Sequence, residues 1–325
     1  MQKILAASVV AACLVVGVSA SAHEPVASYP SRPVRLIVGY QAGGPTDLTA
    51  RLLASRLQLA FGQPFLVENK PGAGSNIASE YVANAPADGY TLLVAAAPIT
   101  MAGFMYRNLK WNVQDSFEPV SLLMSAPAVL AVANNVPAKT VPELIQLAKK
   151  QPGQLSFGST GNGGTQHLAG EMLKSRTGID IIHVPYKGAA GAMQDLLSGQ
   201  VTMAFMTSVS ALPLLKDNKA RPLAVAAEKR LAQLPQVPTM AEAGVPGFVV
   251  DSWNGLLAPK GTSPALIARL HAEVAKAMMA PEVREKLEAQ GAVVVGNNPA
   301  EFKAYIRDEV GHWDKLLKTM RIKLD

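Results

Sequence analysis

Two glycine-rich turns, one in each half of the chain, hold residues whose types and spacing suit anion binding. The first covers residues 39–47 with the sequence GYQAGGPTD, and the second covers residues 158–165 with the sequence GSTGNGGT. Each follows a short apolar run and precedes an amphipathic pattern that predicts a helix. The N–H groups at a helix start lack partners and lie at the positive end of the helix dipole, which favours an anion. Two such starts facing each other would hold a small molecule with a carboxylate at each end.

In the first turn, Pro45 suits the first position of a helix, which makes Gly44 its N-cap and Asp47 the third helical residue. Asp47 is a candidate ligand-binding residue; the structural alternative is that its carboxylate accepts a hydrogen bond from the Gly44 N–H. Paired glycines also permit close approach of a ligand to the backbone. We therefore expect the N–H groups of Gly43 and Gly44 to contact the ligand.

The second turn adds neutral donors to its glycines. Ser159, Thr160, Asn162 and Thr165 carry hydroxyl and amide groups that would fix a polar ligand without adding charge. The structural alternative is a flexible turn in which Thr165 caps the helix. Neither turn has the Gly-Lys-Ser/Thr of a Walker loop or the GxGxxG pattern of a dinucleotide site.

Two later strand ends supply further candidates. Tyr186 and Lys187 lie between a predicted strand and a predicted helix, where Tyr186 would line a cleft and Lys187 would attract an anion. A solvated turn is the alternative for Lys187. Thr207 and Ser208 stand at the end of the next strand, and either cap a helix or face the cleft.

Concentrated catalytic chemistry is absent from the sequence. It contains no HExxH, CxxC or GxSxG motif and no histidines paired at metal-ligand spacing. His167 and His183 lie in periodic segments, and we interpret them as structural. The sequence predicts a binding protein without metal or cofactor. A hydrolase with a dispersed serine triad is the alternative from another class.

The N-terminus reads as a secretory signal peptide over residues 1–22. Lys3 precedes the apolar stretch Ile4–Val18, and the following Ala-Ser-Ala ends at Ala22 in the pattern of a cleavage site. We expect cleavage after Ala22 and a mature protein in the periplasm. Lipidation of Cys13 is the alternative, but the apolar stretch continues beyond that residue.

Charge and cysteine content narrow the possible partners. Cys13 is the only cysteine and lies in the predicted signal, so the mature chain has no thiol for a disulfide, a metal or catalysis. The formal net charge of the 325 residues is +6, a modest excess that steers anions toward the protein. No run of Lys and Arg interleaved with aromatic residues indicates nucleic-acid binding.

Short apolar runs alternate with helical patterns along most of the chain. Val34–Val38, Phe65–Glu68 and Thr91–Ala95 predict strands, and Thr46–Phe61 and Ser75–Asn84 predict helices between them. The same alternation recurs in the middle of the chain, and the C-terminal part reads as mostly helical. Such alternation predicts an α/β fold with parallel strands joined by helices.

The length and the two turns predict two domains around a ligand cleft. We expect domain 1 over residues 23–123, domain 2 over 124–225 inserted into it, and the rest of domain 1 over 226–325 with the C-terminal helices. No low-complexity linker is visible, so extended strands would join the domains. The candidates are Glu118–Met124, Leu223–Ala227 and Ser252–Leu257.

An ordered set of motifs resembles the periplasmic solute receptors of tripartite tricarboxylate transporters, the Bug receptor family. The likeness covers essentially the whole mature sequence. The resemblance implies a two-domain Venus-flytrap fold of the type II periplasmic binding class, which delivers a small organic anion to membrane permease subunits. The motifs are YPSRPV from residue 29, AGGxxD from 42, VENKPGAG from 67, DGYTL from 88, HVPYKG from 183, VPTxxExG from 237 and GLLAP from 255.

The resemblance also implies which positions hold the ligand. Backbone amides of the first turn would hold a carboxylate, often with water, and the second domain would add side-chain contacts. The matching positions are Tyr40, Ala42, Gly43 and Gly44 in the first domain, and Ser159, Thr160, Asn162, Thr165 and Tyr186 in the second.

Two positions depart from the family pattern. Members commonly carry serine or threonine after the third strand, where this chain has Ala96-Ala97-Pro98, and many carry an acidic or amide residue where Met206-Thr207 stand. Both changes make the predicted pocket more apolar. We therefore expect Pro98 and Thr207 at the pocket, and a ligand with an apolar or aromatic body in preference to citrate. We further expect a monomer; a ligand sensor for a signalling partner is the alternative to a transport receptor.

Overall fold

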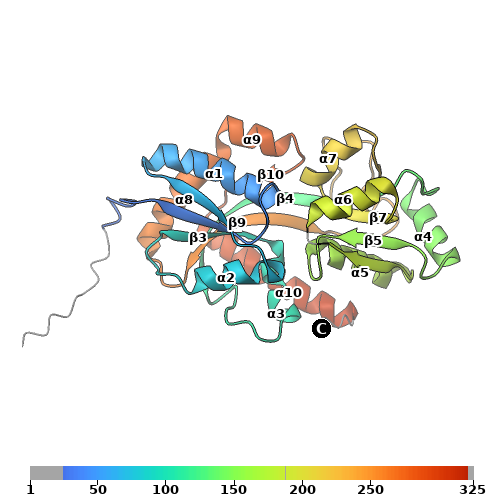
Figure 1. The fold of residues 1–325 in the computed structure, drawn as a ribbon, viewed down its shortest axis with the longest axis horizontal. Helices are drawn as coiled ribbons and strands as arrows, with labels where there is room; N and C mark the ends of the chain where they lie inside the picture. The colour runs from blue at the N-terminus through green and yellow to red at the C-terminus, as the bar shows by residue number, and fades with distance from the viewer. Residues whose placement is uncertain (1–24, 187, 321–325) are drawn as a thin grey trace, which may run out of the picture.

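The computed structural model of the chain describes residues 25–186 and 188–320. Within these ranges the chain forms two α/β lobes that lie side by side (Figure 1). The predicted signal peptide with its cleavage site, Cys13 and Lys187 fall outside the described residues.

The first lobe contains a mixed sheet. Its strands are β1 (Val34–Val38), β2 (Phe65–Asn69), β3 (Thr91–Ala96), β4 (Phe117–Val132), β9 (Asp251–Pro259) and β10 (Val293–Val294). Strand β1 lies between β2 and β3 and is parallel to both. Strand β9 pairs antiparallel with β3 and with β4, and β10 pairs antiparallel with β4.

Helices cover both faces of this sheet (Figure 1). They are α1 (Pro45–Phe61), α2 (Asn76–Ala83), α3 (Ala102–Met105), α8 (Pro264–Met279), α9 (Pro281–Glu288) and α10 (Pro299–Met320), with 3₁₀ turns at Ala73–Ser75 and Ala97–Thr100. Proline at the first position starts α1, and Gly62 with a φ of 68° ends it. None of the helices in the described ranges has the length and apolar character needed to span a bilayer.

The second lobe repeats the alternation of strand and helix. Its strands are β5 (Ser156–Ser159), β6 (Ile182–Pro185), β7 (Met203–Thr207) and β8 (Arg221–Ala226), and its helices are α4 (Val141–Lys150), α5 (Thr165–Thr177), α6 (Ala189–Ser198) and α7 (Ser208–Lys216). Strand β5 is parallel to β6 and β7. The predicted α/β fold is confirmed, and the predicted elements differ from the observed ones by one or two residues at their ends.

Strand β4 carries the chain from the first lobe to the second (Figure 1). Its first part pairs with β9, and its last five residues, Ala128–Val132, pair with β7 and β8. The chain returns at Val250, whose carbonyl accepts the Ala128 N–H and whose N–H donates to the Ala226 carbonyl, both at 2.9 Å. The predicted segment Glu118–Met124 lies on β4, but the crossing itself comes a few residues later, before Ala128. The predicted segment Ser252–Leu257 belongs to β9 in the first lobe, just after the chain has returned. The prediction that Leu223–Ala227 crosses is wrong, because β8 pairs only with the second-lobe part of β4.

The boundary of the second lobe differs from the predicted one. Buried side chains from Leu231 to Val250 pack in the same apolar core as Ala128 and Phe157. A return to the first domain at residue 226 is therefore too early, because this segment buries its apolar side chains in the second lobe. We propose that the second lobe spans residues 128–250 and that the first lobe comprises the chain on either side.

A buried carboxyl group lies where the chain re-enters the first lobe. Asp251 accepts a hydrogen bond from the Ser125 hydroxyl of β4, and its Oδ1 has no partner among the described residues. Burial raises the pKa of Asp251 to about 6; the bond from Ser125 opposes this rise, and the nearby Glu309 adds to it. Glu309 of α10 is half-buried and accepts bonds from the indoles of Trp253 and Trp313 at 3.4 and 3.2 Å.

We predict that Asp251→Asn stabilises the protein at alkaline pH. A carboxyl group with a raised folded-state pKa stabilises the fold fully below pH 3.8, and this contribution is lost as the pH rises through about 6. Above that pH a buried carboxylate with one unpaired oxygen remains, and the neutral amide removes its cost. We expect the free energy of unfolding to rise by about 1–3 kcal/mol at pH 8, measured by chemical denaturation.

The gain should shrink as the pH is lowered from 6 to 4, where the carboxyl group is protonated in the fold. Asp115→Asn, which changes an exposed carboxylate, serves as the control and should alter stability little at either pH. An equal gain at pH 4 and pH 8 would show that the pKa of Asp251 is not raised.

Candidate ligand-binding site

Two adjoining cavities lie between the lobes. The hinge cavity, of about 360 Å³, is bordered by the first residues of α1, α5 and α6, by the start of α7, and by Ser252–Asn254 of β9. The loop cavity, of about 480 Å³, is bordered by the segment 71–75 and by the turn before α5. The residues that line both are Tyr40, Gln41, Pro98 and Thr160.

Most of the predicted contact residues come together around these cavities. Asp47 lines neither cavity, and Lys187 lies outside the described residues. Asn162 and Tyr186 line the loop cavity. Those that line the hinge cavity are Tyr40, Ala42, Gly43, Gly44, Pro98, Ser159, Thr160, Thr165 and Thr207.

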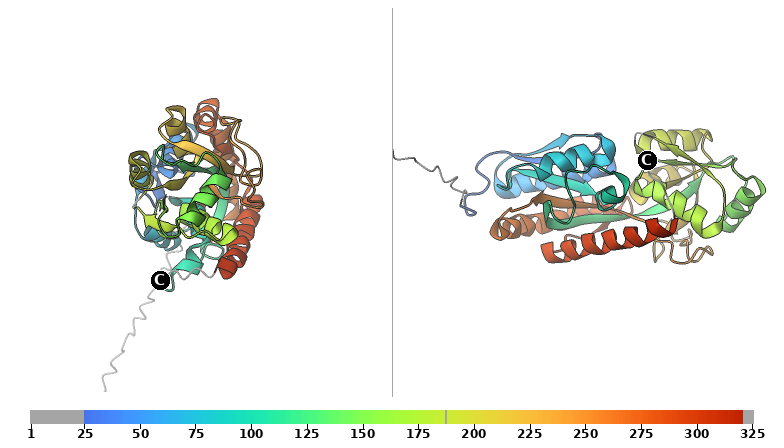
Figure 2. Two further views of the ribbon diagram at one scale, coloured as in Figure 1. Left: turned by 90° about the vertical axis from the view of Figure 1, so that its right-hand side faces the viewer. Right: turned by 90° about the horizontal axis from the view of Figure 1, so that it is seen from below.

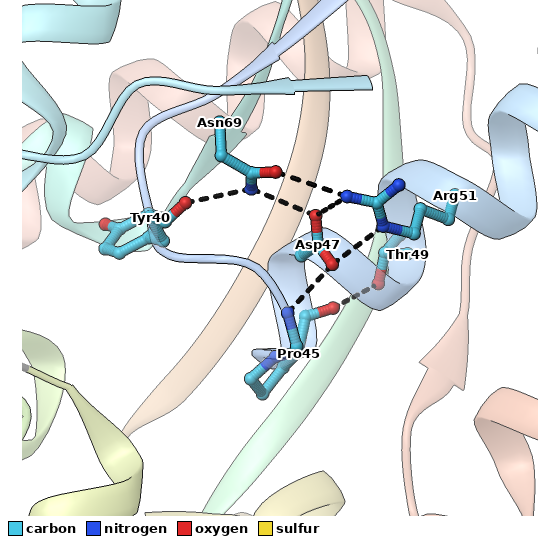
Figure 3. A network of polar contacts seen from close by, with 7 residues as sticks. Tyr40, Pro45, Asp47, Thr49, Arg51 and Asn69 are labelled. Atoms are coloured by element: carbon cyan, nitrogen blue, oxygen red, sulfur yellow. Dashed lines mark hydrogen bonds and ion pairs between the residues drawn. The ribbon is translucent and has the colours of Figure 1, made fainter. Parts of the chain in front are cut away.

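The first turn is held in shape by the carboxylate of Asp47 (Figure 3). Its Oδ2 accepts the Gly43 N–H and the Arg51 Nε–H, both at 2.9 Å. Its Oδ1 accepts bonds from Arg51 Nη2 at 3.0 Å and from Asn69 Nδ2 at 2.9 Å. Asn69 Nδ2 also donates to the Tyr40 carbonyl at 2.9 Å. The network ties the turn to the end of β2.

The same contacts keep Asp47 ionised. Burial alone would raise the pKa of Asp47, but hydrogen bonds from Arg51, Gly43 and Asn69 and the positive charge of Arg51 outweigh it and hold the pKa below its ordinary value. The Asp47 side chain is 4% exposed, whereas that of Arg51 is 53% exposed. The negative charge of Asp47 is therefore balanced within the turn and away from the cavities.

This geometry corrects the predicted partner of Asp47, which is Gly43 and not Gly44. Gly43 has a φ of 88°, a left-handed conformation that turns its N–H toward the carboxylate behind the loop. The Gly43 amide is thus occupied. Leu48 is the residue whose N–H makes the first backbone bond of α1, to the Gly44 carbonyl at 2.9 Å, and the N–H groups of Gly44, Thr46 and Asp47 precede it at this helix start.

The second turn is held by side chains from α5 and β6. Gly164 takes the N-cap position, so Thr165 is the first helical residue and does not cap α5 as the structural alternative expects. The Thr165 hydroxyl is buried and has no partner in the described part of the chain. Thr160 Oγ1 donates to Gln166 Oε1 at 2.8 Å and fixes that side chain at the cavity wall.

Two more helix starts border the hinge cavity. The Thr207 hydroxyl accepts the Ser210 N–H at 3.3 Å, so Thr207 caps α7 and also lines the cavity. Gly188 is the N-cap of α6, and Ala189 and Ala190 follow it along the cavity wall. Thr207 therefore both caps a helix and faces the cavity, which the sequence presented as alternatives.

Of the tyrosines that border the loop cavity, Tyr40 and Tyr186 do so in different ways. The Tyr186 hydroxyl donates to Asp195 Oδ2 at 2.5 Å, and burial followed by this contact raises the pKa of Tyr186 to about 12. Because the Tyr186 hydroxyl is occupied by this bond, the ring of Tyr186 is the part of the side chain that can contact a molecule in the cavity. The Tyr40 hydroxyl is buried with no partner among the described residues, and burial raises its pKa above the ordinary value.

The cavity walls are uncharged and partly apolar. No described residue that lines either cavity has a charged side chain. The apolar side chains that line the hinge cavity bring thioether, aromatic and methyl groups from both lobes. These belong to Met124, Ala126, Met193, Phe205, Met206 and Trp253.

Several lining residues escape the sequence reasoning. Thr46 and Gln166 stand in the first turns of the two predicted helices, so their positions beside the glycine-rich turns are a signal that could have identified them. Asn254 carries no local signal, since β9 brings it from the far end of the chain, where its Nδ2 donates to Thr46 Oγ1 at 3.0 Å. Ser210 of α7 is likewise added only by the fold.

Two α/β lobes joined by crossing strands, with helix starts around an uncharged cavity between them, define a bilobed solute-binding protein. A family model described as "Tripartite tricarboxylate transporter family receptor" matches residues 49–322. The chain belongs to this receptor family.

Solved structures are similar over nearly the whole chain. Rpa4515 of R. palustris with adipate is 37% identical with a TM-score of 0.86, and the match covers 90% of this chain and 99% of that one. The periplasmic binding protein BugD is 35% identical with a TM-score of 0.85, covering 91% and 99%. MatC of Rhodopseudomonas palustris with bound malate is 32% identical with a TM-score of 0.84, covering 89% and 100%. The fold is that of the two-lobed periplasmic binding proteins.

We predict that Asp47→Ala lowers the free energy of unfolding by about 1–3 kcal/mol at pH 7, because it leaves the Gly43 N–H and Asn69 without their shared acceptor. Arg51→Ala should cost less, since its guanidinium is half exposed. Because the pKa of Asp47 is lowered in the fold, its contribution exists above the ordinary value and disappears as the pH falls through the lowered pKa. Urea denaturation of the three proteins at pH 7 and pH 3 measures this; a larger loss for Arg51→Ala would contradict it.

Proposed function

We propose that this chain captures a small organic carboxylate between its lobes and presents it to the permease subunits of a tripartite transporter. The observation that carries this proposal is the convergence of the starts of α1, α5, α6 and α7 on a cavity whose described lining is uncharged. Each helix start is equivalent to roughly half a positive charge, so the four together suit about two carboxylates. Membership of the receptor family supports the transport role, and the adipate and malate bound by two similar proteins support the ligand class.

The proposed contacts come from both lobes. In the first lobe, the N–H groups of Gly44 and Thr46 would hold one carboxylate, with Tyr40 and Ala42 beside it. In the second lobe, the start of α5 would hold the other end of the ligand. Its contacts would come from Thr160, Thr165 and Gln166, with Asn162 and Tyr186 at the loop cavity. Contacts to both lobes are what would favour the closed arrangement when ligand binds.

A role without catalysis agrees with the surroundings of Ser159. Ser159 Oγ and His183 Nε2 lie 2.7 Å apart, the spacing of a nucleophile and its base. Ser159 is only 1% exposed, and no carboxylate in the described ranges bonds to His183. The serine lies at the wall of the hinge cavity but exposes almost no surface, and the imidazole lacks the acidic partner of a triad. We propose a receptor and not a hydrolase.

We further propose that the receptor acts as a monomer in the periplasm and that its partner is a permease, not a signalling protein. The description of the family as a transporter receptor supports the permease. Capture of the receptor on membranes that contain the permease pair, compared with membranes that lack it, distinguishes the two partners.

The apolar side chains that line the hinge cavity support a ligand with an apolar body. Methionine thioethers and aromatic rings pack well against a ring or a methylene chain. A trianion such as citrate would bring more negative charge than the helix starts balance. It would also bury polar groups against Phe205 and Met206, which offer no hydrogen bond.

We predict that thermal unfolding against a carboxylate panel will identify the ligand class. The panel contains adipate, malate, citrate, benzoate and terephthalate. A ligand at 100 times its dissociation constant adds about 2.7 kcal/mol to the free energy of unfolding, and we expect the largest upward shift of Tm from a mono- or dicarboxylate with an apolar body. Tight binding of citrate with no response to the benzene carboxylates would overturn this ligand class. A panel without any response would argue against the receptor function.

A second prediction separates binding from folding at the start of α5. Thr165→Val removes a hydroxyl that has no partner in the described structure, so stability should hold or rise slightly, while affinity for the tightest acid of the panel should fall about tenfold. Thr262→Val is the matched control, since its hydroxyl is buried but donates to the Pro259 carbonyl at 2.8 Å away from the cavities. The control should lose stability and keep affinity. Unchanged affinity in Thr165→Val, measured by calorimetry, would place the ligand elsewhere.

A further inference from the structure

Two stacked imidazoles lie behind the turn between β5 and α5. His167 of α5 and His183 of β6 have ring centroids 3.9 Å apart and an interplanar angle of 15°. The ring of Phe157 continues the stack, 4.9 Å from that of His183. Neither histidine lines the hinge cavity or the loop cavity. Any effect on a ligand must therefore pass through the turn.

Both rings hold backbone of this turn by hydrogen bonds. The Gly163 N–H donates to His167 Nδ1 at 3.0 Å, which requires that nitrogen to be unprotonated and places the ring proton on Nε2. His183 Nε2 lies 2.7 Å from Ser159 Oγ, and the same oxygen accepts the Gly161 N–H at 3.2 Å. Two amides of the turn are thus anchored, one directly and one through a serine.

The position of Gly163 gives these bonds a consequence at the cavity. Gly163 has a φ of 74°, and a Cβ there would stand 1.4 Å from Met105 Cε of the first lobe. The turn therefore passes close to the opposite lobe in a conformation that glycine permits. Loss of the bond to His167 would let this segment move relative to Thr165 and Gln166, whose donors face the proposed ligand.

The surroundings of the rings favour their neutral forms. Burial lowers the pKa of His167; Lys174 lowers it further, and Glu171 opposes this. Burial also lowers the pKa of His183, to about 4, with contributions from His167 and Lys174. Phe157, which stacks from β5, carries no charge. A proton on either ring would place a positive charge 3.9 Å from the other ring.

We propose that His167 and His183 are positioning residues for ligand binding, which hold the second turn in its binding conformation, and that His167 does so only while its imidazole is neutral. A proton on His167 Nδ1 removes the acceptor of the Gly163 N–H. Acidification therefore loosens the turn and weakens binding, beyond the effect of protonating the ligand itself. This inference rests on the proposed carboxylate-binding function and adds a pH dependence to it.

The test compares His167→Asn with the wild-type protein. Asparagine Oδ1 can take the place of His167 Nδ1 as acceptor but does not titrate. His271→Asn in α8 of the first lobe is the control for loss of a histidine outside the stack. Affinities for adipate and for terephthalate are measured by calorimetry at pH 7.5 and pH 5. We expect wild type and His271→Asn to lose about fivefold more affinity over this interval than His167→Asn, the effect of one hydrogen bond. Protonation of the probe is common to all three proteins and cancels.

Imidazole ¹⁵N NMR of the unliganded protein gives a readout independent of any ligand. We expect His167 with its proton on Nε2 at pH 7.5 and both rings titrating below the ordinary value of 6.5. His167→Gln, which also offers an amide oxygen that does not titrate, is the second variant if His167→Asn does not fold, and it should flatten the pH profile in the same way.

The inference is overturned if His167 carries its proton on Nδ1, or if the pH profiles of wild type and His167→Asn coincide. Failure of both probes to bind any of the proteins at pH 7.5 would overturn the proposed function and this inference with it, whatever the NMR result. Binding with identical profiles would overturn this inference alone.

Discussion

The unpaired N–H groups at helix starts are the constraint on which the arrangement of this protein depends. A helix cannot satisfy its first N–H groups internally, and burying them without acceptors is costly. Here four helices begin at a shared cavity whose described walls carry no charged side chain. The Thr207 hydroxyl accepts one N–H of α7, and acceptors for the other helix starts would come from water or from a ligand with oxygen atoms. An anion held in this way is neutralised by fixed dipoles, so neither lobe has to bury a lysine or arginine beside it.

The position of these helix starts depends on how the chain crosses between the lobes. Strand β4 pairs with β9 in the first lobe and with β7 and β8 in the second, so one continuous strand is shared by the sheets of both lobes. Helix α10 runs along the face below this crossing (Figure 2). The Glu309 carboxylate of α10 accepts hydrogen bonds from the indole groups of Trp253 and Trp313. Trp313 also packs with Leu168 of the second lobe. The C-terminal helix therefore contacts both lobes next to the segment that any opening motion must bend.

Both binding turns are shaped by residues that stay out of the cavities. Asp47, Arg51 and Asn69 hold the first turn, and His167 and His183 hold the second. In each case a glycine with positive φ gives its N–H to a side chain behind the loop, and residues that follow it line the hinge cavity. The charge of Asp47 is balanced by Arg51, while the imidazoles are kept neutral by burial. The first turn should therefore be insensitive to mild acid, and the second is the one for which we propose a dependence on pH.

The sequence by itself determined the α/β alternation, the two glycine-rich turns and the helices that follow them, because these depend on local periodicity and on the conformational freedom of glycine and proline. It also predicted correctly that residues near Tyr40, Thr160 and Thr165 would come together. The partner of Asp47, the bond between Asn254 and Thr46, the stacking of His167 on His183 and the extent of the second lobe to Val250 were decided only by the tertiary structure. Each of these features depends on the direction in which a backbone or side-chain group points. A left-handed glycine or a strand that crosses between the lobes changes that direction, and the local pattern of residues does not show the change.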